Sequence, residues 1–165
     1  MMGEQVKNVN VVLRHPKASD AITIGGFLKE RDIADSIPGL GSNETDPANA
    51  ILHSALERSA AFGERHFVMV AGKNVVGMCV LYNIGDGEAE IGYWVGAAYR
   101  RKGYATAAIR ALAGKAHLMG VYKIKAKVMK PNKASVALLY SIGFSSSGTE
   151  GDATEYSADT ASIKA

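Results

Sequence analysis

The chain has 165 residues, of which 47% are hydrophobic and 21% are charged, as is typical of a folded globular protein rather than a disordered one. This length accommodates one ordinary domain with a buried core, and we expect residues 1–165 to form a single domain. The net charge of +3 is small and its basic residues are dispersed, which argues against a nucleic-acid-binding protein.

Several further classes are disfavoured by what the sequence lacks. No apolar run approaches the ~20 residues needed to span a bilayer, and the first ten residues do not resemble a secretory signal. We therefore expect a cytoplasmic protein that does not bind membranes. The four histidines lie far apart without metal-ligand spacing, so no metal site is predicted. Cys79 is the one cysteine, which excludes an internal disulfide, and its apolar neighbours predict a buried side chain.

The first third of the chain predicts one strand and two helices. Residues 9–14 are extended and end at Pro16, and residues 17–31 are helix-like although they contain two adjacent glycines. A polar segment rich in Gly, Asn and Pro follows at residues 38–47 and predicts a loop. Asp46 is placed to cap a helix that begins at Pro47 and ends near Phe62.

Three consecutive strands are predicted next. Residues 66–71 and 75–84 flank a Gly-Lys-Asn turn and form a hairpin, and a third strand spans residues 88–96. Alternation along the third strand predicts two faces. One carries Ala89, Ile91, Tyr93 and Val95, and the other carries Glu88, Glu90, Gly92 and Trp94.

The remaining elements alternate helices and strands. A helix of residues 104–119 ends at Gly120, a half-buried strand covers 123–130, and Asn132 is placed to cap a helix of residues 133–142. A weaker final pair of strands follows Phe144. This order predicts an α/β fold built on a single mixed sheet.

The segment from Tyr99 to Thr106 joins a strand directly to a helix N-terminus. Unpaired N–H groups and the positive end of the helix dipole make such a position favourable for an anion. Gly103 permits close approach of a phosphate to the backbone, Ala105 is small, and three consecutive basic residues add positive charge: Arg100, Arg101 and Lys102. The alternative is an exposed basic turn without a ligand.

The motifs of P-loop NTPases and of dinucleotide-binding folds are absent from the sequence. The pattern R-x-x-G-x-A at residues 100–105 occurs with EIGYWV at 90–95 and with N-x-x-S at 132–135, followed by Gly143-Phe144. This combination resembles the GNAT superfamily of N-acetyltransferases. The resemblance extends from Phe67 to Phe144 and is closest to the branch of ribosomal-protein N-terminal acetyltransferases.

The resemblance implies a mostly antiparallel sheet flanked by helices and splayed between its fourth and fifth strands. It also implies acetyl-CoA as the acyl donor, with the pantetheine arm in the splayed gap and backbone groups near Val95 facing the thioester. The predicted donor-binding residues are Trp94, Val95, Arg100, Arg101, Lys102, Gly103, Tyr104, Ala105, Thr106 and Asn132. For Asn132 the alternative is a helix cap alone, and for Trp94 and Val95 it is core packing.

Acetyl transfer needs a neutral amine, a stabilised oxyanion and a route for the thiolate to leave. Glu90 is the candidate general base, acting through a water, although a solvated strand carboxylate is the alternative, as it is for Glu88. Ser135, or an ordered water, could protonate the thiolate, which could also leave unassisted. Tyr140 is excluded because the superfamily tyrosine lies at the position of Leu139, and one helical residue is a rotation of ~100°.

The acceptor is less clearly encoded. Acidic residues in segments 38–47 and 145–162 favour a primary amine, either a protein N-terminus or a small molecule, although solvated loop charges are the default explanation. The C-terminal segment is less hydrophobic than is usual in the family, so the acceptor pocket is either open or completed by a partner chain, as in a homodimer. Two alternatives to a catalytic enzyme are an inactive acyl-CoA-binding module and a nucleotide- or nucleic-acid-binding domain.

Overall fold

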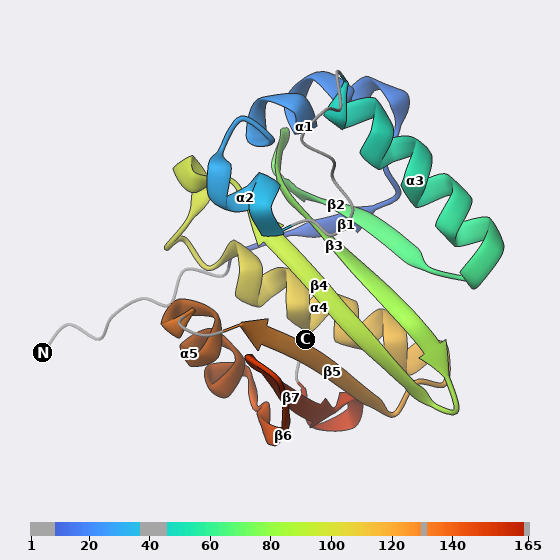
Figure 1. Ribbon diagram of the computed structural model, residues 1–165, viewed down its shortest axis with the longest axis vertical. Coiled ribbons are helices and arrows are strands. Elements are labelled where there is room, and N and C mark those ends of the chain that lie inside the picture. Colours follow the sequence, from blue (N-terminus) through green and yellow to red (C-terminus); the bar gives the residue numbers. More distant parts are fainter. Residues whose placement is uncertain (1–8, 37–45, 130–131, 164–165) are drawn as a thin grey trace, which may run out of the picture.

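The computed structural model describes residues 9–36, 46–129 and 132–163. They form a seven-stranded mixed sheet flanked by helices, with the strand order β1-β2-β3-β4-β5-β7-β6 (Figure 1). The strands are β1 (Val12–Arg14), β2 (Arg65–Ala71), β3 (Asn74–Gly85), β4 (Glu88–Val95), β5 (Lys123–Met129), β6 (Ser145–Glu150) and β7 (Ala153–Asp159). The helices are α1 (Ala21–Phe27), α2 (Arg31–Ser36), α3 (Pro47–Phe62), α4 (Tyr104–Leu118) and α5 (Lys133–Ile142).

Two hydrophobic clusters hold the helices on opposite faces of the sheet. The larger cluster lies under α4 and α5, where Ile109, Leu112 and Leu139 are fully buried against side chains of six of the strands. The smaller cluster lies under α1, α2 and α3 and reaches only β2, β3 and β4, with Ile24 and Val68 at its centre. The first three helices therefore cover half of their face, and the corresponding face of β5, β7 and β6 is left open.

Side-chain alternation in β4 is confirmed. Ala89, Ile91 and Val95 are buried in the larger cluster, whereas Trp94 packs on the smaller one with its ring 5.5 Å from that of Phe27. The same strand thus contributes to both cores at one end and carries its glutamates at the other.

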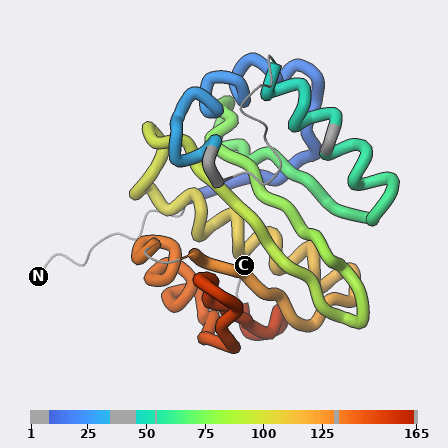
Figure 2. Tube along the Cα trace, in the orientation of Figure 1, coloured from blue at the N-terminus to red at the C-terminus, as the bar shows by residue number. Residues whose placement is uncertain are grey.

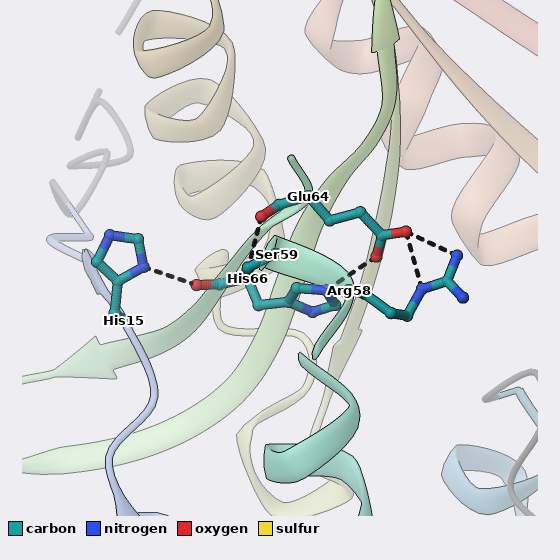
Figure 3. A network of polar contacts seen from close by, with 5 residues as sticks. All are labelled: His15, Arg58, Ser59, Glu64 and His66. Carbon is teal, nitrogen blue, oxygen red and sulfur yellow. Dashed lines mark hydrogen bonds and ion pairs between the residues drawn. The ribbon is translucent and has the colours of Figure 1, made fainter. Parts of the chain in front are cut away.

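A polar network joins α3 to β2 (Figure 3). Glu64 is 4% exposed, and its carboxylate accepts from Arg58 Nε at 2.8 Å and lies 3.0 Å from His66 Nε2. Burial disfavours the charge of this carboxylate, but the hydrogen bonds from Arg58 and His66 outweigh that cost and hold the pKa of Glu64 below its usual value. The Ser59 hydroxyl donates to the Glu64 carbonyl at 2.7 Å, so the helix end and the strand start are fixed together.

The N-terminal region differs in detail from the prediction. The first strand is shorter than the predicted residues 9–14. A short helix that was not predicted, α2, follows α1. The carbonyl of Glu30 starts this helix by accepting from the N–H groups of Ile33 and Ala34. Asp20 is buried and accepts from both terminal nitrogens of Arg14 at 2.8 Å, which ties the start of α1 to β1.

Cys79 lies in the larger core and is 3% exposed, as its apolar neighbours predict. Burial raises the pKa of its thiol to about 12. Within the residues that the structure describes, no helix is long and apolar enough to cross a membrane. The same residues bring no three His, Cys, Asp or Glu side chains together in a metal-binding arrangement.

Candidate active site

The strands β4 and β5 run parallel but pair over only three positions. Their register joins Glu88 to Lys123, Ala89 to Ile124 and Glu90 to Lys125, and the strands then diverge (Figure 1). Among the described residues, positions 91–95 of β4 have no partner on β5, although β3 pairs with β4 along its length. The predicted splay is therefore confirmed, and it leaves one edge of β4 free to hydrogen-bond an extended group.

The end of β4 is followed by a short 3-10 helix, Ala97–Tyr99, which the sequence did not predict, and then by the basic loop and the N-terminus of α4. Gly103 adopts the left-handed conformation at φ +84° and precedes the helix, and Arg101 also has a positive φ of 60°. A positive φ is uncommon for a residue other than glycine and is often found at functional sites. In the described structure no side chain caps this 15-residue helix, so the first-turn N–H groups of Tyr104, Ala105 and Thr106 are available to an anion.

Arg100 makes contacts that the sequence does not predict. Its Nε donates to the carbonyl of Val95 at 3.0 Å, and its Nη2 lies 2.6 Å from the carboxylate of Asp32 in α2. Glu30 adds a second link, because its carboxylate accepts from the backbone N–H of Ala97 at 2.7 Å. The guanidinium of Arg100 is thus directed toward the first helices, while Arg101 and Lys102 are exposed in the loop.

Glu90 lies at the point where the two strands separate, on the face opposite the larger core. Its side chain is 16% exposed, and Lys127 Nζ is 4.0 Å from its Oε1. Tyr82 is its register partner on β3. Burial, together with a hydrogen bond from the Tyr82 hydroxyl to Glu90, raises the pKa of Tyr82, so the tyrosine remains a neutral donor toward the carboxylate.

Glu88 occupies a different environment on the same face. Its carboxylate lies 3.0 Å from Lys125 Nζ, and the hydrogen bond from Lys125 lowers the pKa of Glu88. A carboxylate that is stabilised in its charged form is a weaker base. Glu88 is thus held by a direct ion pair, whereas the lysine nearest to Glu90 in the described ion pairs lies 4.0 Å away.

The second predicted motif lies at the start of α5. Asn132 caps the helix, since its Oδ1 accepts from the Ser135 N–H at 3.2 Å. Helix α5 and the loop before α4 lie on the same side of the molecule, to the left in Figure 2, in orange and yellow. The elements that carry the predicted donor-binding residues therefore lie around the end at which β4 and β5 diverge.

One polar atom in this region is not anticipated by the sequence analysis. Alternation predicts Tyr93 only as a core-facing residue, but its hydroxyl is buried beside Ser135 at the start of α5. Tyr140, by contrast, is 53% exposed, and its ring packs against Tyr156 of β7 at 5.5 Å. Leu139 is fully buried, which agrees with the helical rotation used to exclude Tyr140.

The regions expected to frame the acceptor are only partly described. Residues 37–45, which include most of the predicted 38–47 loop, lie outside the described residues. The C-terminal hairpin is present: β7 pairs with all seven residues of β5, and β6 pairs only with β7. Glu150 is mostly exposed at the end of β6 and lies 3.4 Å from Lys127 Nζ, near Glu90.

A model of the GNAT acetyltransferase domain matches residues 10–145, which is most of the chain. This protein belongs to the GNAT acetyltransferase family. The assignment confirms the predicted N-acetyltransferase, and the matched residues include both sequence motifs and the strands between which the sheet opens. Among curated proteins, none matches the sequence significantly.

Solved structures of other acetyltransferases share the fold. The microcin C7 self-immunity acetyltransferase MccE, solved with acetyl-CoA and AMP, has a TM-score of 0.78 at 20% identity over 93% of this chain and 94% of that one. RimJ of Mycobacterium smegmatis, solved with CoA-disulfide, has a TM-score of 0.77 at 21% identity over 90% and 81%. The spermidine N-acetyltransferase of Vibrio cholerae, solved with CoA and spermine, has a TM-score of 0.77 at 19% identity, over 92% of this chain and 96% of that one.

Proposed function

We propose that this GNAT protein transfers an acetyl group from acetyl-CoA to a primary amine by direct attack of the amine on the thioester, within one acetyltransferase domain formed by residues 1–165. The observation that carries the proposal is the course of β4. Its edge is free of β5 after Glu90, and its end leads into the uncapped N-terminus of α4. An extended arm that ends in a pyrophosphate matches these two features in the same order.

The residues present are suited to hold such a donor. The backbone of Trp94 and Val95 would pair with the pantetheine amides, and the amide side chain of Asn132 would reach the same arm. The carbonyl of Val95 already accepts from Arg100 but has two lone pairs, so it can accept a second hydrogen bond. The N–H groups of residues 103–106 would bind the pyrophosphate, with Arg101 and Lys102 compensating its charge.

In this arrangement Glu90 removes a proton from the amine, through a water, as the nitrogen attacks the carbonyl carbon. The carbonyl oxygen develops negative charge beside the N–H groups at the end of β4, near Val95. Ser135 lies at the α5 N-terminus, where a thiolate is favoured by the helix dipole. These roles match the positions of the side chains on the two sides of the splay.

The acceptor is expected to approach the open face of the sheet, where Glu90 and Tyr82 lie. Glu150 and the hairpin carry acidic groups beside it, which suits an amine-bearing peptide N-terminus or small molecule. The related spermidine N-acetyltransferase was solved with spermine, a polyamine, which supports an amine acceptor here. The exposed β6 edge leaves room for a second copy of the chain to complete the pocket.

The test is release of free thiol from acetyl-CoA in the presence of N-terminal peptides, polyamines, amino acids and aminoglycosides. We expect thiol release that depends on at least one amine class, with the acetylated amine identified by mass spectrometry. Tight binding of acetyl-CoA without release for any amine would favour an inactive acyl-CoA-binding module. Tight binding of ATP or polynucleotide with no binding of CoA would instead favour an anion-binding domain and would overturn the proposal.

A further inference from the structure

The hydroxyl of Tyr93 is the unusual polar atom of the splayed region. Tyr93 lies on β4 three residues beyond Glu90, where pairing with β5 ends, and its ring packs against the larger core. Its side chain interacts with that of Ser135 at the start of α5, so it reaches from β4 toward the helix that follows β5. Its oxygen is buried at the level of Ser135.

Tyr93 Oη has no hydrogen-bond partner among the described residues. Burial raises the pKa of Tyr93, and the Ser135 side chain opposes this shift in part, but it does not satisfy the Tyr93 hydroxyl with a full hydrogen bond. A buried hydroxyl without a partner is destabilising, and native proteins retain few such groups. Because no described residue satisfies Oη, a molecule bound in the gap between β4 and β5 is a candidate partner for it.

We propose that Tyr93 donates a hydrogen bond through Oη to the sulfur of the acyl donor at the α5 N-terminus, and that it takes the place of the displaced Tyr140 in supporting departure of the thiolate. The inference rests on the proposed function, because it requires the donor to occupy the gap between β4 and β5. Tyr93 would then be a catalytic residue that touches the leaving group, with Ser135 beside it.

The role is that of a hydrogen-bond donor rather than of an acid. When the amine nitrogen bonds to the carbonyl carbon, the C–S bond breaks and its electron pair leaves on sulfur. The proton of the amine passes to Glu90 through water, and the thiolate is protonated from solvent after it departs. Burial holds the pKa of Tyr93 above that of an ordinary phenol, so its hydroxyl stays protonated and serves as a hydrogen-bond donor.

Tyr140 offers the same functional group in the wrong place. Its side chain is 53% exposed and its ring packs on Tyr156 of β7 at 5.5 Å, whereas Tyr93 reaches the larger core from β4. The chain therefore carries a tyrosine hydroxyl at the leaving-group position, but from β4 rather than from the helix. A tyrosine supplied by β4 in place of one on α5 explains why the Tyr93 hydroxyl is buried without a full hydrogen bond.

The test compares CoA with desulfo-CoA, which lacks only the sulfur, by calorimetry at an alkaline pH at which part of the free thiol is ionised. We expect the wild-type protein to bind CoA on the order of tenfold more tightly than desulfo-CoA, and Tyr93→Phe to reduce this preference to about twofold or less. We also expect kcat to fall about 10- to 100-fold with little change in KM for acetyl-CoA. Tyr140→Phe is the matched control and should keep the wild-type preference.

Thermal unfolding separates this role from a structural one. Tyr93→Phe removes an unpaired buried hydroxyl without changing the ring, so its Tm should equal or exceed that of the wild type. Equal weakening of CoA and desulfo-CoA, or an unchanged preference for CoA, overturns the proposal while leaving the acetyltransferase function intact. A wild-type protein that binds neither compound overturns the proposed donor site as well.

Discussion

The two halves of the sheet are built differently. Strands β1–β4 have α4 on one face, and β2–β4 also have the first three helices on the other, so β2 and β3 are buried on both sides. Among the described residues, α4 and α5 are the helices that cover β5 and β7, and the other face of these strands carries Lys123, Lys125 and Lys127 opposite Asp159, Ser157 and Glu155. The two halves meet at three register pairs between β4 and β5.

The two halves of the sheet therefore have different roles. The doubly covered half fixes the position of β4 through packing on both faces, whereas the singly covered half exposes charged side chains beside Glu90. The residues proposed to bind acetyl-CoA and the acceptor amine lie along the boundary between the halves. Substitutions in the first half should therefore act mainly on stability, and those at the boundary mainly on turnover.

The largest effect is expected at the boundary, for Glu90→Gln. Loss of the proposed base should lower kcat about 100-fold or more, because general base catalysis contributes at least that factor. The affinity for acetyl-CoA should remain nearly unchanged, since Glu90 is not among the residues proposed to bind the donor. Steady-state kinetics of thiol release near neutral pH measures both quantities.

Glu88→Gln is the control on the same strand and face. Its carboxylate pairs with Lys125, so its loss should change kcat no more than a few-fold. If Glu90→Gln retains the wild-type kcat near neutral pH, Glu90 has no part in the mechanism.

Within the supporting half, Gly77→Ala should be the most damaging small change. A Cβ at Gly77 would meet the carbonyl oxygen of Trp94 at 2.2 Å, so β3 would have to move away from β4. Overpacking of this kind costs about 1–3 kcal/mol of unfolding free energy. Urea denaturation followed by circular dichroism measures the loss.

The other half supplies the matched control. A Cβ at Gly148 in β6 would meet no atom within 4 Å, and Gly148→Ala should leave the unfolding free energy unchanged within about 0.5 kcal/mol. Equal effects of the two alanine substitutions would contradict the distinction between the halves.

A smaller effect is expected for Glu64→Gln, which weakens the junction of α3 and β2. Arg58 is about half-exposed, so solvent screening weakens its ion pair with Glu64. The variant should therefore lose about 1–2 kcal/mol of unfolding free energy at neutral pH. Because the folded pKa of Glu64 is lowered, its stabilisation is present above the unfolded pKa of ~4.3 and disappears as the pH falls through the folded pKa. Thermal melts across pH 3–7 should therefore converge for variant and wild type at the acidic end.

Glu57→Gln serves as the comparison for that series, because Glu57 is mostly exposed on α3 and contacts only His53 in the described ion pairs. Its melting curve should follow the wild type at every pH. A Glu64→Gln protein with the wild-type dependence on pH would show that the network in Figure 3 does not contribute to stability.

The smallest effect on rate is expected for Tyr140→Phe. The hydroxyl of Tyr140 is on the exposed side of α5, so kcat should stay within about twofold of the wild type. A loss of about a hundredfold would place Tyr140 in the mechanism and would require α5 to rotate when substrates bind.

Local patterns in the sequence predicted much of this arrangement. The alternation of β4, the cap of α3 by Asp46 and the cap of α5 by Asn132 depend on neighbours within a few residues, and each is confirmed. The splay could be inferred from the resemblance to a family whose motifs occupy both strands, and it is confirmed by the short β4–β5 register.

The contacts that were not predicted join segments far apart in the sequence. Arg100 pairs with Asp32 across 68 positions of the numbering, and no pattern near either residue indicates that contact. Likewise, alternation assigned the Tyr93 ring to the core but could not place its oxygen beside α5. Such details depend on how the elements pack, which a single sequence does not encode locally.

The burial of Cys79 has a practical consequence at the bench. A thiol that is 3% exposed, with its pKa raised to about 12, has almost no thiolate at neutral pH and reacts slowly with disulfide reagents. The native protein should therefore contribute no background colour to a dithionitrobenzoate assay, so each thiol detected reports one turnover. After denaturation one equivalent per chain should appear, which gives the enzyme concentration in the same cuvette.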